Sequence, residues 1–410
     1  MKGQHSHPST RRTFVKTLGL LAAGGEWAAS LSRLAAAEKA VLPFENGMRD
    51  LVAFPGKRPL LVLTTRPPQL ETPFAVFNEG LITPNDAFFV RYHLTDVPTR
   101  VDSASFRLKI LGAVRKPLEL SLDALKKLAT PVDLVAVNQC SGNSRGFFSP
   151  RVNGGQLGHG AMGCVRWTGV PLRAVLDAAG VEPRARQVSF DGLDRGLLDA
   201  TPDFVKALDI DHARDGEVMI AWGMNGEDLP MLNGYPLRLV VPGYYGTYWV
   251  KHLHRIEVLT SIYDGFWMKS AYRIPNTPDH NIEPGTTPKA TVAISRFNVR
   301  SFITNLGNNS TVSSGRETMV RGIAFDGGSG IRTVEFSADG GRSWKGTQLG
   351  RSLGRFAFRE WTSAFTPNRG THTLMSRATN GNGEIQPLVA GWNPAGYMRN
   401  VVETVNVTAL

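Results

Sequence analysis

The chain has 410 residues, of which 46 are Lys or Arg and 35 are Asp or Glu, so its formal net charge is +11. Residues 1–37 hold five of the basic residues and one of the acidic residues, so the remainder of the chain carries +7. The basic residues form no long runs, which argues against a nucleic-acid-binding protein and is compatible with an anionic ligand. A chain of this length is typically divided into two domains.

The first 37 residues have the features of a removable export signal. Arg11 and Arg12 precede a short apolar stretch at residues 18–23, and three alanines follow at residues 35–37. The stretch is too short to cross a membrane, which takes ~20 apolar residues, and paired arginines are typical of the twin-arginine route. We therefore predict a twin-arginine signal peptide at residues 1–37, a periplasmic location and no membrane span. A disordered basic tail is the alternative.

Residues 88–93 predict a strand with a basic face. Side chains alternate across a strand, so Arg91 and His93 share one face and Tyr92 lies on the other. A solvated strand surface would look the same. Beside a second arginine, however, this face would form an anion site with bidentate guanidinium donors.

A lone thiol follows the next predicted strand. The apolar residues 134–137 predict a buried strand, which leads into Gln139-Cys140-Ser141-Gly142-Asn143-Ser144-Arg145. A rigid strand followed by small turn residues would fix the sulfur of Cys140, with the charge of Arg145 nearby. A neighbouring arginine favours the thiolate, which is a soft metal ligand or a nucleophile. The pattern predicts a metal–sulfur bond beside an anion pocket.

Cys164 is the second of only two cysteines, and it lies in the mostly apolar segment 162–167. There it has the features of a small core residue, but in an oxidising compartment two cysteines often form a disulfide, and sequence spacing does not exclude a bond to Cys140. No Cys-x-x-Cys-His sequence occurs, so we predict no haem in this chain.

The remaining elements up to residue 285 mix helices and strands without strict alternation, which favours an α+β domain at residues 38–285. The helices are predicted at residues 121–129, 171–179 and 201–208, and the strands at 237–243 and 251–259. The pair Asn225-Gly226 between apolar flanks predicts a hairpin turn.

Two groups of polar residues in the predicted strands could bind ligands. Arg238 and Lys251 could neutralise a phosphate, although a structural ion pair is the alternative. His252 and His254 would share a side of a strand as a possible metal clip, but without a third ligand in the sequence a surface strand is the favoured interpretation.

The tail from residue 286 to residue 410 predicts an immunoglobulin-like β-sandwich, because short strands alternate with turns rich in Gly, Asn and Asp. The strands are expected at residues 290–295, 301–306, 317–324, 331–337, 355–361 and 372–378. Residues 274–288 predict a proline-punctuated linker. The tail holds no catalytic cluster, so its expected role is assembly.

Several motifs in the same order resemble the sulfite oxidase family, and most closely the molybdenum subunits of its bacterial periplasmic sulfite dehydrogenases. The likeness covers nearly the whole chain after the signal, and it is carried by residues 89–93, 139–145, 163–172, 224–230 and 233–251. The resemblance implies that Cys140 is the protein ligand to molybdenum. It also implies a substrate pocket lined by Arg91, His93, Arg145 and Tyr272. The pterin and its phosphate would be held by Phe89, Val90, Arg91, His93, Asp194, Asn233, Arg238, Trp249, Val250 and Lys251. Asn233 replaces a histidine, and Tyr92 an asparagine, of the vertebrate enzymes.

The same resemblance implies a function: oxidation of sulfite to sulfate at a molybdenum cofactor, with electrons passed singly to a c-type cytochrome, which could be a stable haem subunit. The sandwich would form a homodimer or a heterodimer. A molybdenum-dependent reductase of methionine sulfoxide or another oxide is the first alternative, and an exported anion-binding protein without redox activity is the second. The residues without the family likeness indicate only an exported metal and anion site.

Overall fold

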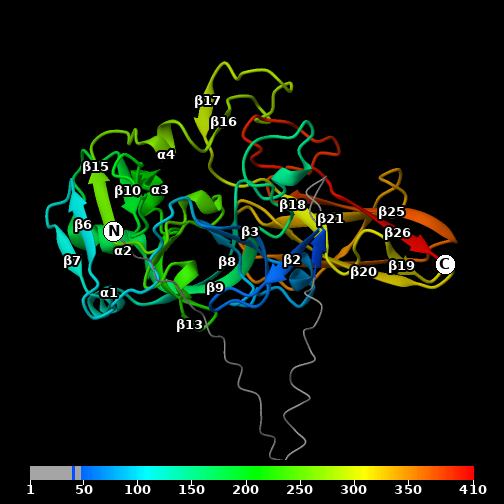
Figure 1. Ribbon diagram of the computed structural model, residues 1–410, viewed down its shortest axis with the longest axis horizontal. Coiled ribbons are helices and arrows are strands. Elements are labelled where there is room, and N and C mark those ends of the chain that lie inside the picture. The colour runs from blue at the N-terminus through cyan, green and yellow to red at the C-terminus, as the bar shows by residue number, and fades with distance from the viewer. Residues whose placement is uncertain (1–38, 42–47) are drawn as a thin grey trace, which may run out of the picture. The chain divides into compact units, whose positions relative to one another are not determined.

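A computed structural model describes residues 39–41 and 48–410 of the chain (Figure 1). The predicted signal peptide at residues 1–37 therefore lies outside the described residues, and its assignment stays a prediction. Residues 39–410 form one compact unit. Within the described part of the chain, no helix is both long and apolar enough to cross a membrane.

Three sheets and four short helices make up the first part of this unit, which we call the mixed domain. The first sheet is antiparallel, in the order β1 (Lys39–Val41), β2 (Met48–Val52), β3 (Leu60–Thr65), β4 (Pro68–Glu71) and β5 (Val90–Arg91). The second has the order β11 (Lys206–Asp209), β10 (Gln187–Asp191), β15 (Arg255–Leu259), β6 (Leu108–Gly112) and β7 (Leu118–Leu120), and only its β15–β6 pair is parallel. The third has the order β13 (Glu227–Asp228), β12 (Met219–Met224), β9 (Met162–Pro171) and β8 (Val132–Gln139), with β14 (Arg238–Val240) also paired to β12. The helices are α1 (Leu122–Leu128), α2 (Leu172–Ala179), α3 (Ile210–Arg214) and α4 (Phe266–Lys269).

Local signals explain the predicted elements that the structure contains. Ser121 caps α1 by accepting a hydrogen bond from the Ala124 N–H at 3.2 Å, and α2 ends at Gly180, which has φ 69°. The predicted turn at Asn225-Gly226 joins β12 to β13, and both residues have the positive φ that this turn requires. These predictions are confirmed.

The predicted helix at residues 201–208 is wrong. Residues 206–209 form β11, in which Leu208 pairs with Val188 of β10. Because Ala207 and Leu208 are buried in this sheet, their tertiary packing overrides the local helical preference. The predicted strand at residues 251–259 begins only at Arg255.

Two packed sheets form the second part of the unit, which we call the sandwich. One has the order β18 (Arg300–Ile303), β20 (Thr318–Phe325), β24 (Arg359–Phe365) and β23 (Gln348–Leu349). The other has the order β19 (Ser310–Val312), β26 (Thr404–Ala409), β25 (Gly370–Asn380), β21 (Ile331–Ser337) and β22 (Lys345–Gly346). Val320, Phe336, Trp361 and Leu374 fill the core between them. An α+β domain followed by a β-sandwich is the predicted fold class, which is confirmed.

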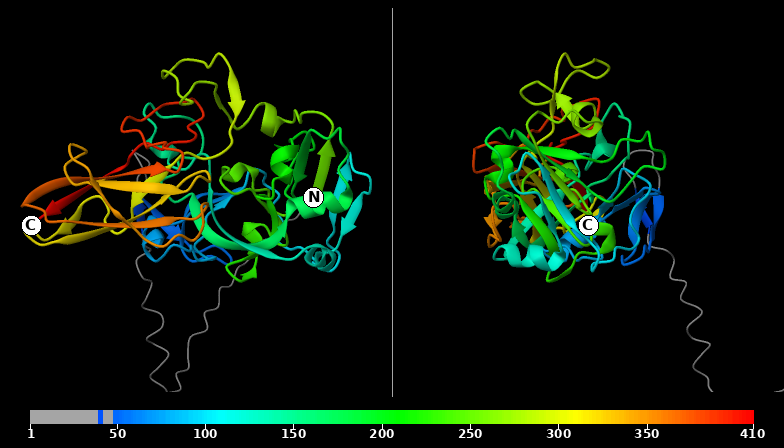
Figure 2. Two further views of the ribbon diagram at one scale, coloured as in Figure 1. Left: turned by 180° about the vertical axis from the view of Figure 1, so that it is seen from behind. Right: turned by 90° about the vertical axis from the view of Figure 1, so that its left-hand side faces the viewer.

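The mixed domain and the sandwich share one continuous apolar core. Phe302, Phe325 and Phe358 of the sandwich belong to the same buried cluster as Trp167 of the mixed domain. Figures 1 and 2 show the sandwich strands, coloured yellow to red, at one end of the unit and the cyan and green sheets at the other. Part of the predicted linker is a strand, because β16 (Arg273–Pro275) pairs with β17 (Thr291–Ala293). The predicted domain limits, 38–285 and 286–410, stay predictions.

Candidate active site

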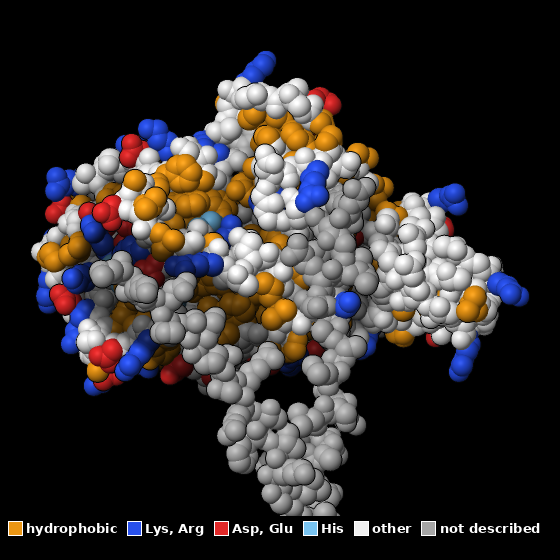
Figure 3. Space-filling model, viewed as in Figure 1, with side chains coloured by type: hydrophobic (Ala, Val, Ile, Leu, Met, Phe, Trp, Pro, Cys, Tyr) orange, Lys and Arg blue, Asp and Glu red, His pale blue; other side chains and the backbone are white. Residues whose placement is uncertain are grey.

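A cavity lies where the ends of β5, β8 and β14 meet. Its lining brings together residues that are far apart in the sequence: Phe88, Phe89, Val90, Arg91, His93, Asn138, Cys140, Ser141, Phe204, Leu232, Asn233, Arg238, Gly246, Thr247, Lys251 and Tyr272. Nine of the predicted site residues are among them. On the face in Figure 3, hydrophobic side chains surround a small group of basic and histidine side chains.

The thiol of Cys140 is held by a tight turn at the end of β8. The Cys140 N–H donates to the Ala161 carbonyl at 2.9 Å, and the Cys140 carbonyl accepts from the Asn143 N–H at 3.0 Å. Gly246 approaches this strand so closely that a Cβ there would lie 2.4 Å from the Asn138 Oδ1 atom. The sulfur-bearing residue is therefore fixed by backbone contacts on both sides, as its strand-and-turn sequence predicts.

Both cysteines are free thiols, so the disulfide between Cys140 and Cys164 does not form. Cys164 lies on β9 in the core, where its sulfur accepts a hydrogen bond from the Phe358 N–H at 3.5 Å. Burial raises the pKa of Cys164 to about 12, so this sulfur stays protonated at neutral pH. Cys140 lines the cavity and Cys164 does not.

His93 lies in an aromatic pocket beside the cavity. Its Nε2 atom is hydrogen-bonded to the Tyr272 hydroxyl, and its ring stacks on Phe204 with 4.1 Å between centroids and 7° between planes. Burial lowers the pKa of His93 well below its usual value, and the charges of Arg91 and Lys251 lower it further, so the imidazole is neutral at pH 7. Tyr272 has φ 58°, a left-handed conformation that is uncommon for a residue with a side chain.

Tyr92 lies on the opposite side of this strand from the cavity, as the alternation predicts. Its hydroxyl is hydrogen-bonded to the Nε2 atom of His252 at 2.7 Å, and the Nδ1 atom of His252 donates to the Tyr235 carbonyl at 2.6 Å. His252 is fully buried. The predicted surface strand at residues 252–254 is therefore wrong. The Nε2 atom of His254 instead lies 3.4 Å from Oδ2 of Asp191, so the two imidazoles do not form a common metal site.

Arg238, which is buried, and Lys251, which is partly buried, place two cations at the cavity. The Arg238 guanidinium lies over the ring of Trp167 at 4.8 Å and donates to the carbonyls of Asn233 and Trp249. Lys251 donates to the Arg91 carbonyl at 2.8 Å. Burial lowers the pKa of Arg238 to about 10 and that of Lys251 to about 7. A structural ion pair does not explain them, because among the described residues no carboxylate lies within ion-pair distance of either side chain.

Four predicted site residues do not line the cavity: Arg145, Asp194, Trp249 and Val250. Arg145 donates from Nε to the Ala395 carbonyl at 3.1 Å, and its guanidinium lies over Tyr397, whose ring stacks on Tyr272. Asp194 is buried; burial raises its pKa, and the charge of Lys251 opposes the shift. Trp249 packs against Arg238. Trp249 thus contacts a residue that lines the cavity, whereas Arg145 reaches the lining through Tyr397.

Sequence reasoning missed Lys57, Phe204, Asn138 and Thr247. Lys57 is buried, and its ammonium donates to Asn233 Oδ1 at 2.6 Å and to the Asn85 and Phe88 carbonyls. Burial lowers its pKa to about 7. No motif marks this lysine, because its partner Asn233 is 176 positions away. For Thr247 the sequence offers one signal, the segment rich in Gly and Tyr at residues 243–248.

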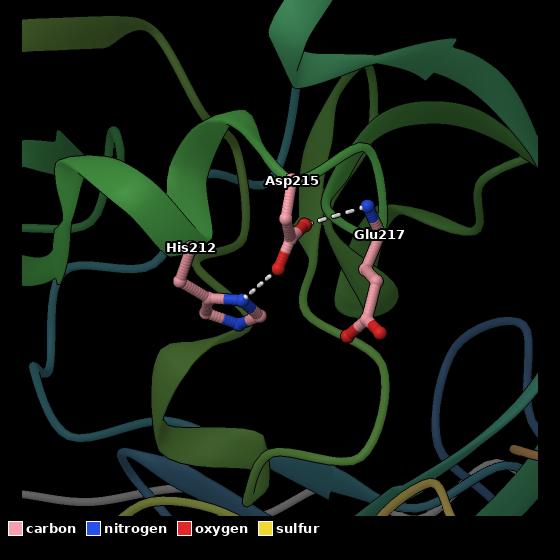
Figure 4. Close-up of side chains that lie close together, drawn as sticks. All are labelled: His212, Asp215 and Glu217. Carbon is pink, nitrogen blue, oxygen red and sulfur yellow. Dashed lines mark hydrogen bonds and ion pairs between the residues drawn. The ribbon is translucent and has the colours of Figure 1, made fainter.

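His212, Asp215 and Glu217 form a second group of possible metal ligands, away from the cavity (Figure 4). Their side chains are already engaged: Asp215 accepts from His212 Nδ1 at 2.6 Å, and Glu217 pairs with Arg296 at 2.8 Å and Arg355 at 2.5 Å. Because both arginines belong to the second half of the chain, the group joins the two halves by ion pairs. A cation would have to compete with two guanidinium groups for Glu217.

The fold and the cavity together define a molybdopterin-dependent oxidoreductase with a dimerisation domain. Residues 94–267 match the model of the oxidoreductase molybdopterin-binding domain, and residues 291–409 match that of the Mo-co oxidoreductase dimerisation domain. The mitochondrial sulfite oxidase of Rattus norvegicus is 32% identical over 375 residues, which are 86% of this chain and 66% of the rat protein. The sulfite oxidase of Gallus gallus is 31% identical over 361 residues, 83% of this chain and 76% of that protein. The chain belongs to the sulfite oxidase family.

Among solved structures, the sulfane dehydrogenase SoxCD from Paracoccus pantotrophus superimposes with a TM-score of 0.71 and 26% sequence identity. The match covers 83% of this chain and 84% of that chain. At this coverage the match includes parts of both the mixed domain and the sandwich.

The cofactor of the protein is the molybdenum cofactor, and the residues at the cavity fit it. Within the described part of the chain, four buried atoms of the lining have no hydrogen-bond partner: Asn138 Oδ1, Ser141 Oγ, Arg238 Nε and Thr247 Oγ1. Buried polar atoms are rarely left unpaired, so these four indicate a polar ligand. A thiol that suits molybdenum and cations that suit a phosphate line the same space.

Proposed function

We propose that this protein oxidises sulfite to sulfate. The observation that carries the proposal is one cavity lined by a free thiol, Cys140, and by Arg91, Arg238 and Lys251 without paired carboxylates. Cys140 would bind molybdenum, while Arg238 and Lys251 would neutralise the phosphate of the pterin. When bound, the cofactor supplies an oxygen atom for transfer and takes up two electrons.

The residues around His93 would bind and orient the substrate. Arg91 offers guanidinium donors to the oxygens of a small oxyanion, and its positive charge would offset the negative charge of sulfite. The neutral imidazole of His93 and the hydroxyl of Tyr272, already hydrogen-bonded to each other, present polar atoms at the cavity. Phe204 and Trp267 pack against the His93 ring, so they would limit the access of water and thereby strengthen these polar contacts.

The proposed reaction adds one oxygen atom, derived from water, to sulfite and releases two protons and two electrons. The electrons would pass one at a time to a c-type cytochrome, as the resemblance to sulfite dehydrogenases implies. The cytochrome could be a soluble protein or a stable haem subunit. Steady-state reduction of cytochrome c by sulfite, together with elemental analysis, tests this. We expect about one molybdenum per chain and sulfite-dependent reduction; a molybdenum-loaded protein inactive with sulfite would contradict the proposal.

The two alternative functions give different results in the same experiments. A molybdenum-dependent reductase would consume methionine sulfoxide with a reduced dye and leave sulfite unchanged. An anion-binding protein would contain no molybdenum. The match of residues 291–409 to the dimerisation domain and the similarity to sulfite oxidases favour the oxidase.

We further propose that the protein is exported to the periplasm by the twin-arginine route and assembles through the sandwich, as a homodimer or with a haem subunit. Arg11-Arg12 with the apolar residues 18–23 supports the route, and the dimerisation-domain match supports the assembly. Cell fractionation of the wild type and of a variant with both arginines changed to lysine tests the export. Retention of only the variant in the cytoplasm is expected; equal export of both would contradict the proposal.

A further inference from the structure

A loop of the sandwich half, residues 393–398, lies against the candidate active site. Asn393 closes the loop, because its side chain donates to the Tyr397 carbonyl at 2.9 Å and accepts from the Tyr397 N–H at 3.1 Å. The Gly396 N–H also donates to the Asn393 carbonyl, at 3.0 Å. These hydrogen bonds fix the 393–398 loop without regular secondary structure.

The 393–398 loop contacts both the thiol turn and Arg145. The Met398 N–H donates to the Ser141 carbonyl at 3.0 Å, next to Cys140 in sequence. The Ala395 carbonyl accepts from Arg145 Nε at 3.1 Å. A Cβ on Gly396 would lie 2.9 Å from Arg145 Cγ, so the backbone of the loop abuts the arginine. The sandwich thus forms one wall of the space that holds the Arg145 side chain.

Tyr397 joins Arg145 to the residues that line the cavity. The Arg145 Cζ atom lies 5.0 Å from the centroid of the Tyr397 ring, within the range of a cation–π contact. The Tyr397 ring also stacks on Tyr272, with 5.3 Å between centroids and 8° between planes. Tyr272 in turn is hydrogen-bonded to His93. One aromatic ring therefore touches two predicted substrate residues that come from different parts of the mixed domain.

Two features of this contact go beyond ordinary packing. Tyr272 has φ 58°, and a side-chain-bearing residue keeps such a backbone conformation only where its surroundings enforce it. The parallel ring of Tyr397 is one of those surroundings. Arg145 does not line the cavity itself, and its side chain is fixed by Tyr397 and the Ala395 carbonyl of the loop and by the Gly155 carbonyl, at 3.4 Å.

We propose that Tyr397 is a positioning residue for oxyanion binding, whose ring holds the Arg145 guanidinium and the Tyr272 ring in the orientation that receives the substrate. The identity of the oxyanion rests on the proposed function. The sandwich then has a role in substrate affinity besides assembly, and a substitution in it should change binding more than turnover.

Three substitutions at Tyr397 in the full-length, molybdenum-loaded protein separate positioning from folding. Tyr397→Leu removes the aromatic face, Tyr397→Phe keeps it, and Tyr397→Met fills similar space without it. Val389→Ala is the control, because Val389 precedes the loop in the same segment and is 81% exposed. The measurements are KM and kcat for sulfite, Kd for sulfate, molybdenum content and thermal stability.

We expect Tyr397→Leu and Tyr397→Met to raise KM for sulfite and Kd for sulfate about tenfold, in line with a lost cation–π contact, and to change kcat by less than about threefold. Tyr397→Phe keeps the ring but loses the hydroxyl, which is hydrogen-bonded to Arg145, so its KM and Kd should rise by clearly less than those of the non-aromatic variants. Val389→Ala should stay within about twofold of the wild type. If Tyr397→Leu strongly lowers the thermal stability, the KM and Kd of Tyr397→Met decide the question instead. Unchanged KM and Kd in both non-aromatic variants, or an equal loss in the Phe variant, would overturn the inference.

The sulfate measurement keeps this inference apart from the proposed function. A wild type that binds sulfate but does not oxidise sulfite contradicts the function, while the change in Kd still decides the role of Tyr397. A wild type that oxidises sulfite while the variants bind and react like it contradicts only the role of Tyr397. A loaded wild type that neither binds sulfate nor oxidises sulfite contradicts both.

Discussion

The cavity and the contact between the mixed domain and the sandwich each hold a buried arginine, Arg238 and Arg300, with further basic side chains around it, but they differ in how these charges are balanced. At the contact, buried Arg300 donates to the Ser144 hydroxyl of the mixed domain at 3.0 Å and to Glu403 at 3.3 Å. Glu403 also accepts from Arg399 at 3.1 Å, and Glu217 pairs with the more exposed Arg296 and Arg355. At the cavity, Arg91, Arg238 and Lys251 have no carboxylate within ion-pair distance among the described residues.

The difference separates a structural cluster from a ligand site. An unpaired buried cation destabilises a protein unless something anionic compensates for it. Burial would raise the pKa of Glu403, but His159, Arg399 and Arg300 together hold it below its usual value, so the contact supplies its own anion. At the cavity no carboxylate is paired with a cation in this way among the described residues: burial lowers the pKa of Lys251 to about 7, although the charge of Asp194 opposes this shift. A directly paired anion is best supplied by the cofactor and the substrate.

The largest expected effect comes from replacing Cys140, whose thiol lines the same cavity as Arg238 and Lys251. Cys140→Ser should lower sulfite oxidation at least about a thousandfold, about 4 kcal/mol in the barrier, because a hydroxyl is a poor soft ligand. Cys164→Ala, the matched control, should lose about 1–2 kcal/mol of stability and keep its activity per molybdenum. Steady-state rates, metal analysis and denaturant unfolding measure both. Equal losses of activity in the two variants would mean that the two sulfurs do not differ in role.

Changing a cavity cation should affect the cofactor rather than the fold. Arg238→Met should weaken cofactor binding by about 3–5 kcal/mol, as expected when one partner of a buried charge pair is removed. The cofactor-free variant should be as stable as the wild type within about 1 kcal/mol, because an unpaired cation has been replaced by an apolar chain. Molybdenum content and urea unfolding of the cofactor-free proteins measure this. A fully loaded but unstable variant would identify Arg238 as structural.

Changing Glu403, the carboxylate at the contact, should lower the stability of the fold and leave the cofactor content unchanged. Glu403→Gln leaves Arg300 and Arg399 without their anion, so the free energy of unfolding should fall by about 3 kcal/mol while molybdenum per folded chain is unchanged. Glu335→Gln is the control, since Glu335 pairs with Arg377 nearer the surface and should cost under about 1 kcal/mol. A Glu403 variant with native stability and low molybdenum content would reverse the comparison between the two regions.

Local patterns predicted a large part of the fold and the centre of the site. The alternation of side chains along a strand places Arg91 and His93 on one face and Tyr92 on the other. The strand and the small turn residues around Cys140 fix the thiol. Both patterns involve only residues that are close in the sequence, so the sequence alone reveals them. The spacing of short strands and turns predicted the sandwich for the same reason. The predicted roles of the site residues, beyond their positions, stay predictions.

The sequence did not reveal the contacts that depend on tertiary structure. Lys57 meets Asn233 across 176 positions, and Arg145 meets Ala395 across 250. Neither contact leaves a periodic signal. The segment at 201–208 was assigned to a helix because a single sequence does not show that β10 lies beside it. The sandwich looked free of catalytic residues for the same reason, although Tyr397 reaches the site from it.

Glu71 provides the last test of the comparison, because it is a buried carboxylate that lacks a cation among the described residues. It accepts only backbone N–H groups, from Gly158 at 2.9 Å and Gly160 at 2.6 Å, and burial raises its pKa from 4.5 to about 7. Between these two pKa values the folded protein keeps the proton that the unfolded chain loses. The contribution of Glu71 to stability is therefore greatest below pH 4.5 and is lost as the pH rises to about 7.

Replacing this carboxyl by an amide should remove that pH dependence. The stability of the wild type relative to Glu71→Gln should fall by about 2 kcal/mol between about pH 5 and pH 7.5, measured by urea unfolding at each pH. Glu79→Gln, at an exposed ion pair with Arg58, should show no such change. A relative stability that stays constant with pH would mean that the two N–H groups balance the charge as well as Arg300 and Arg399 balance Glu403. The absence of paired carboxylates at the cavity would then be weaker evidence for an anionic ligand.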